Sequence, residues 1–145
     1  MTGDRFIDLA ARLTMPPNQG EEHYRSAVSR AYYGAFHAVR EFLAGLGFRV
    51  PTLDAHEYLA VRLQQSGHDE AQSAGSKLST LRTARNIADY DLQNPLFQSV
   101  KNARIRVEAA KEIVAIIRRC GSDTATKAAV KRGIEAYENL FPYGR

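Results

Sequence analysis

The chain has 145 residues, of which 44% are hydrophobic and 25% charged, and its formal net charge is +4 at pH 7. These values fit one domain of an ordinary globular protein, and the mild positive charge permits an anionic partner such as RNA without requiring one. No segment approaches the roughly 18 consecutive apolar residues of a membrane span, and the first residues lack the pattern of a signal peptide. We therefore expect a cytoplasmic protein with no membrane contact.

Helical periodicity dominates the sequence, and almost no run of β-branched residues alternates with polar ones. The periodicity predicts helices over 6–13, 21–46, 58–63, 74–92 and 100–119, and a C-terminal helix over 123–141. Turn-forming segments such as MPPNQG and QSGHDE separate them. The predicted fold class is all-α, an up-and-down bundle of five to six helices. Residues 1–145 are expected to form a single domain with its core in 5–119.

The second predicted helix carries two apolar stripes. One is made of small residues, which let another backbone approach closely, and it consists of Ala27, Ala31, Gly34, Ala35 and Ala38. The other is bulky and consists of Tyr32, Phe36, Val39 and Leu43. A helix that is apolar on two sides is largely buried. Because one small bundle does not obviously bury both stripes, we expect a homodimer.

The remaining face of this helix is polar and includes Arg30, Tyr33 and His37. Charged groups that become buried need partners, and this face offers almost no carboxylate. The segment LRTARNIADYDL in the fourth predicted helix can supply one, because Arg85 and Asp89 are four residues apart on one helical face. Asp89 can accept from Arg85 within its helix or from Arg30 across the bundle.

Two segments, SRAYYGAFHAVREFL and then RTARNIADYD, carry a resemblance to a known family. In this order they resemble the HEPN superfamily of prokaryotic helical domains, and most of all its short stand-alone branch of the toxin–antitoxin type. The resemblance covers about residues 6–118. It implies a helical bundle that dimerises. In many members, residues of two protomers meet in a cleft and act as a metal-independent ribonuclease.

The ribonuclease site of such members has an Arg, followed by a polar residue, and then a His with four to six residues between the Arg and the His. The Arg carries over to Arg85 and the polar residue to Asn86, but the window for the His begins with Tyr90 and holds no histidine. RNA cleavage through the 2′-hydroxyl needs a base and an acid, and one His near neutrality can serve as both. Tyr has a reference pKa near 10 and is a poor base, and Asp89 is expected to stay ionised beside Arg85.

Two functions therefore remain open. In the first, the chain is a HEPN-type module of a prokaryotic toxin–antitoxin or defence system, a dimer that binds a partner protein; the resemblance points to a minimal nucleotidyltransferase. In the second, it is a metal-independent ribonuclease toxin in which Arg85 works with a non-standard base, His37, Asp89 or Tyr90. The missing His favours the first. The rival structural interpretation is a satisfied polar core of Arg30, Arg85, Asp89 and Tyr90 that only fixes helix register.

We expect neither a metal site nor a cofactor. Cys120 is the only cysteine, the HDE segment lacks the residue spacing of helical metal sites, and no glycine-rich phosphate loop appears. His23, His56 and His68 lie at the ends of predicted helices or in loops, and we interpret each as a surface residue. The DAHEYL segment around His56 nevertheless matches a position where the branch often has a His.

Overall fold

The computed structural model describes residues 1–142, and within them the secondary structure is entirely helical. The elements are α1 (Gly3–Leu13), α2 (Glu21–Gly45), α3 (Ala55–Gln64), α4 (Asp69–Tyr90), the 3₁₀ helix η1 (Pro95–Gln98), α5 (Val100–Ser122) and α6 (Thr124–Leu140). The predicted all-α fold is confirmed for this part of the chain. None of the described helices combines the length and the apolar character needed to cross a membrane.

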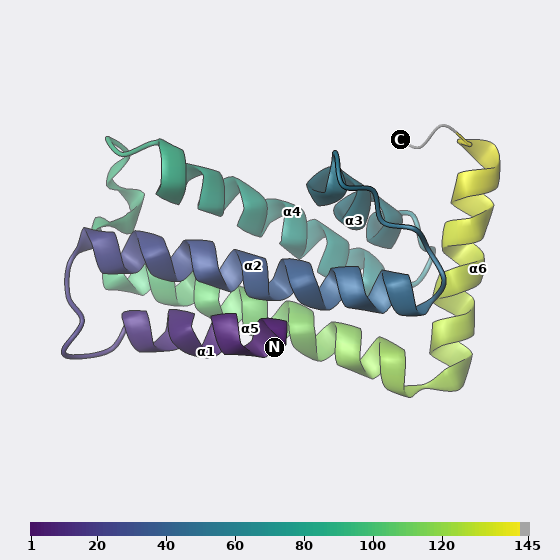
Figure 1. Ribbon diagram of the computed structural model, residues 1–145, viewed down its shortest axis with the longest axis horizontal. Helices are drawn as coiled ribbons and strands as arrows, with labels where there is room; N and C mark the ends of the chain where they lie inside the picture. The colour runs from purple at the N-terminus through teal and green to yellow at the C-terminus, as the bar shows by residue number, and fades with distance from the viewer. Residues whose placement is uncertain (143–145) are drawn as a thin grey trace.

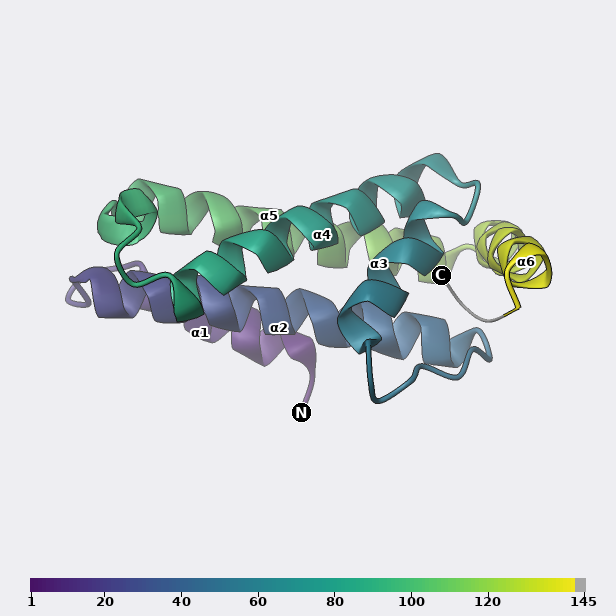
Figure 2. The ribbon, with the colours of Figure 1, turned by 90° about the horizontal axis from the view of Figure 1, so that it is seen from above.

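Four helices form the bundle. α1, α2, α4 and α5 lie along the long axis of the molecule, and successive members of this set run in opposite directions (Figure 1). α2 contacts the other three. α3 lies beside α4 near one end of the bundle, and α6 runs across that end (Figures 1 and 2). The arrangement places the polar face of α2 next to α4 and brings the start of α3 to the same region.

Asn94 and Asp123, residues of types that favour helix N-caps, set the starts of two helical segments. The side chain of Asn94 accepts from the Leu96 N–H at 3.0 Å, and the side chain of Asp123 accepts from the Thr126 N–H at 3.1 Å. The Asn94 cap starts only η1, and α5 begins after Ser99. α5 also continues past the predicted stop at Gly121, because the buried Cys120 holds its last turn in the core.

The small-residue stripe of α2 is covered by other helices of the same chain. Ala27, Ala31 and Ala35 are fully buried. Gly34 lies directly against α1, since a Cβ added to it would be 2.8 Å from the carbonyl oxygen of Gly3. The bulky stripe is buried as well. Packing within one chain therefore accounts for both stripes, so neither stripe supports a homodimer, and the homodimer stays a prediction.

Gly34→Ala should lower the free energy of unfolding by roughly 1–3 kcal/mol, the usual cost of overpacking. The added methyl group would press on Ile7 and on the main chain of Gly3. Gly45→Ala is the matched control at the end of the same helix, because an added Cβ there meets nothing within 4 Å. It should be neutral or stabilise by up to about 1 kcal/mol. Urea unfolding measures both, and equal stabilities would contradict the close approach of α1 and α2.

Candidate functional site

Arg85 on α4 is the centre of a polar cluster between α4 and α2. Its Nη1 donates to Asn86 Oδ1 at 2.6 Å, its Nη2 donates to the hydroxyl of Tyr33, and its Nε lies 3.2 Å from Asp89 Oδ2. The Arg85 side chain is only 11% exposed, so these protein groups replace most of the water around the guanidinium. The structure thus brings together four of the residues singled out in the sequence, and we call them the Arg85 cluster.

Of its two expected partners, Arg85 and Arg30, Asp89 pairs with Arg85. It pairs with Arg85 in its own helix and accepts from Ser29 Oγ on α2 at 3.2 Å. Arg30 instead places its guanidinium over the ring of Tyr33, 5.2 Å from the centroid. Among residues 1–142, no carboxylate pairs with Arg30. The ion pair that stabilises this region is therefore local to α4, and Arg30 contributes a cation–π contact.

Neither of the other two candidate bases is hydrogen-bonded to Arg85 in the described residues: His37 packs among aromatic rings, and Tyr90 makes only a cation–π contact with Arg85. The ring of His37 packs 5.3 Å from Phe36 and 5.9 Å from Phe6, measured between centroids. Tyr90 is 74% exposed, with its ring centroid 5.6 Å from Cζ of Arg85. Because Tyr90 is exposed and Arg30 lies on aromatic rings, these two residues do not close a buried polar core around Arg85 and Asp89.

His56, at the start of α3, lies beside the Arg85 cluster, and the interpretation of it as a surface residue is wrong. Its half-buried ring stacks on Tyr32 with 5.6 Å between centroids, and its Nδ1 is hydrogen-bonded to the Tyr32 hydroxyl. Burial, and then the positive charges of Arg82 and Arg85, lower the pKa of His56. The DAHEYL segment was the one sequence signal for His56, whereas Arg82 stood out in the sequence beside the helical face of Arg85 and Asp89.

Arg25 is a second residue that the sequence pattern did not reveal. It is 8% exposed and ion-pairs with Glu21. Its Nη1 and Nη2 donate to five carbonyl oxygens, those of Ile87, Ala88, Asp91, Leu92 and Asn94. The last carbonyls of a helix have no partner within it. Arg25 bonds the Ile87 and Ala88 carbonyls of the last turn and three carbonyls that follow it, so it fixes the end of α4 against α2 directly after the Arg85 cluster.

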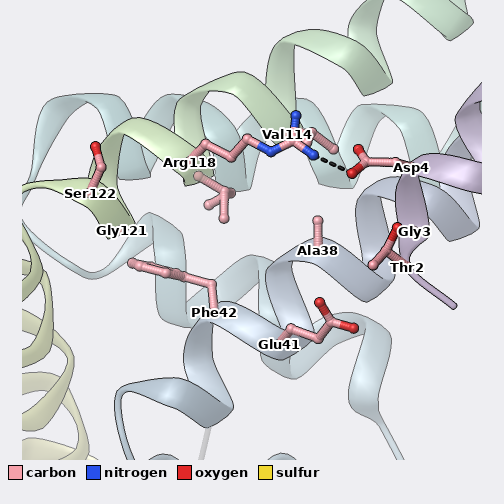
Figure 3. A pocket seen from close by; sticks show the side chains of 11 residues that line it. Thr2, Gly3, Asp4, Ala38, Glu41, Phe42, Val114, Arg118, Gly121 and Ser122 are labelled. Atoms are coloured by element: carbon pink, nitrogen blue, oxygen red, sulfur yellow. Dashed lines mark hydrogen bonds and ion pairs between the residues drawn. The ribbon is translucent and has the colours of Figure 1, made fainter.

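A groove of about 610 Å³ lies between α1, α2 and α5, and no residue of the Arg85 cluster lines it. Figure 3 shows apolar side chains such as Phe42 and Val114 on its walls and an ion pair between Asp4 and Arg118 across it. That pair neutralises the arginine, so the groove has no arrangement of base and nucleophile. Within residues 1–142, no three His, Cys, Asp or Glu side chains gather closely enough to hold a metal ion.

The family model described as the HEPN domain matches residues 17–120. This is most of the chain, and the chain belongs to the HEPN family, as the two sequence motifs indicated. Searches of curated proteins and of solved structures gave no match. The matched region runs from before α2 into α5. It therefore includes the whole Arg85 cluster and His56, and it leaves α1 and α6 outside.

Arg25→Lys should lower the free energy of unfolding by roughly 2–4 kcal/mol, because an ammonium group has three donors and leaves buried carbonyls without partners. Arg30→Lys is the matched control on the same helix. It keeps a cation near the ring of Tyr33, and its effect should stay below about 1 kcal/mol. Denaturant unfolding monitored by circular dichroism measures both. Equal losses would mean that Arg25 does not hold the end of α4.

Proposed function

We propose that this chain is a HEPN-type helical module of a prokaryotic toxin–antitoxin or defence system, acting in the cytoplasm as a homodimer that binds a partner protein. One observation carries the proposal: Nη1 and Nη2 of Arg85 donate to Asn86 and Tyr33, and Asp89 neutralises the charge of Arg85. A charged group that is paired within the chain holds helices together and does not require a substrate. The chain belongs to the HEPN family and carries the motif of its short stand-alone branch. This motif supports a toxin–antitoxin or defence system.

The end of α4 is the surface that best suits a protein partner. Tyr90 is 74% and Leu92 is 65% exposed, and the two residues are two positions apart at the end of the helix. Exposed aromatic residues on a rigid element are typical of the energetically important positions of interfaces. The capping of α4 by Arg25 makes this end rigid. A minimal nucleotidyltransferase is the partner that the resemblance favours, and residues 1–145 act as one domain in this proposal.

Light scattering on the purified chain at tens of micromolar should show a homodimer, with a molar mass twice the 16.1 kDa of one chain. If a minimal nucleotidyltransferase is encoded beside this chain, adding it should give a larger, stable complex. Tyr90→Ala should weaken that complex by about tenfold or more, as the loss of a central aromatic contact does. Ile105→Ala is the control, since Ile105 is 49% exposed but lies on α5. A monomeric chain that forms no complex would refute the proposal.

A second function, metal-independent cleavage of RNA, is favoured by a different observation: His56 is half-buried and shares the aromatic neighbour Tyr33 with Arg85. Asp89, one of the bases considered from the sequence, is less suitable because it is ion-paired with Arg85. The two functions are compatible. A partner protein that covers the exposed end of α4 would hold such a ribonuclease inactive until it dissociates.

A further inference from the structure

The layer that α1 forms on α2 and α5 ends partway along the bundle. α1 begins at Gly3, which lies against Gly34 in the middle of α2. Beyond that contact α2 continues to Gly45, and α5 continues beside it to Ser122 (Figure 1). The groove between α1, α2 and α5 lies there, at the first turn of α1 and along the last turns of the two longer helices.

The floor of this groove is apolar on both sides. Ala38 and Phe42 are four residues apart on α2, and Val114, Ile117 and Gly121 follow one face of α5. Figure 3 shows the side chains of Ala38 and Phe42 directed toward α5. An apolar groove between two helices is the kind of surface into which an amphipathic helix lays its apolar face. The groove therefore lies where a further helix of the α1 layer would pack.

One carboxylate of the groove has no counter-ion among residues 1–142. Three charged side chains line the groove, and two of them, Asp4 and Arg118, pair with each other. The third, Glu41, is exposed on α2, and no described cation forms an ion pair with it. Two carboxylates and one guanidinium give the lining a net charge of −1, although the whole chain carries +4. Glu41 is therefore the charge that a bound molecule would have to match.

The backbone adds to this negative charge at one end of the groove. Phe42 lies in the last turn of α2, and Ser122 is the last residue of α5. The C-terminal ends of helices carry a partial negative charge and attract cations. The last turn of α2 contains no basic residue, and Arg119 in the last turn of α5 pairs with Glu70. A cation beside Glu41 would therefore be attracted by the carboxylate and by the ends of two helices.

We propose that this groove binds an amphipathic helix of a partner protein, with the apolar face of that helix on the groove floor and one of its Lys or Arg side chains paired with Glu41. Such a side chain can lay its apolar stem along the floor while its charged end reaches the carboxylate. The inference goes beyond the partner contact at the end of α4, because neither Tyr90 nor Leu92 lines the groove. The two surfaces can therefore be tested separately.

The test begins with a phage-displayed library of peptides of roughly 16 residues, long enough to form a helix, selected on the full chain. The enriched peptides should share apolar residues spaced three and four apart, with a Lys or Arg beside this stripe. One enriched peptide is then synthesised with a fluorescent label. Fluorescence anisotropy gives its dissociation constant for the wild-type chain and for each variant, and melting curves check that every variant is folded.

Two substitutions in the groove should each raise the dissociation constant by about tenfold or more. Glu41→Lys places like charges together, and it should improve binding of a peptide whose Lys or Arg is replaced by Glu. Glu57→Lys, on the exposed surface of α3, is its control. Gly121→Leu fills the groove beside Phe42, whose ring is 3.8 Å from an added Cβ. Gly45→Leu is its control, because an added Cβ there meets nothing within 4 Å.

Weaker binding in both groove variants, with both controls unchanged, is the result that the inference requires. If no selected peptide responds to Glu41→Lys and Gly121→Leu, the inference is overturned. A peptide that responds only to Tyr90→Ala would overturn it as well and would support the surface at the end of α4. A wild-type homodimer that Gly121→Leu dissociates would show that a second copy of the chain, and not a partner protein, occupies the groove.

Discussion

Hydrogen bonds from two buried guanidinium groups join α2 to α4 at two places. Arg25 of α2 donates to the carbonyl oxygens at the end of α4, and Arg85 of α4 donates to the hydroxyl of Tyr33 on α2. Removing either partner would leave a buried polar group unpaired, which costs more than the bond itself contributes. The relative position of the two helices, and with it the place of Asp89, Tyr90 and His56, follows from these contacts.

The same contacts hold the polar cluster in place for the two functions proposed above. Arg85 is held on three sides by Asn86, Asp89 and Tyr33, so its position is fixed before any ligand arrives. Arg82, one turn earlier, keeps its charge unbalanced among the described residues. The fixed guanidinium of Arg85 beside the unpaired charge of Arg82 is an arrangement that suits the binding of an anion. Partner binding at the exposed end of α4 and RNA cleavage beside it would then depend on one framework.

The sequence predicted the parts of this structure that depend on neighbouring residues. Helical periodicity indicated the helices, Asn94 and Asp123 were recognisable as caps, and the spacing of Arg85 and Asp89 allowed their pairing within one helix. Contacts between distant segments were not predictable. Arg25 donates to carbonyl oxygens that lie 62 to 69 residues further along the chain. The pattern of side chains does not show which main-chain oxygens will accept hydrogen bonds. His56 was missed because its burial depends on how α3 lies against α2 and α4.

A double-mutant cycle on Arg85 and Tyr33 tests most directly whether the polar cluster joins α2 to α4. Arg85→Met, Tyr33→Phe and the double variant would be compared with the wild-type chain by denaturant unfolding. The contact between the guanidinium and the hydroxyl predicts a coupling energy of roughly 1–2 kcal/mol, within the usual range for residues in one hydrogen-bond network. Additive effects, with a coupling below about 0.3 kcal/mol, would contradict the account, because Arg85 would then not connect the two helices.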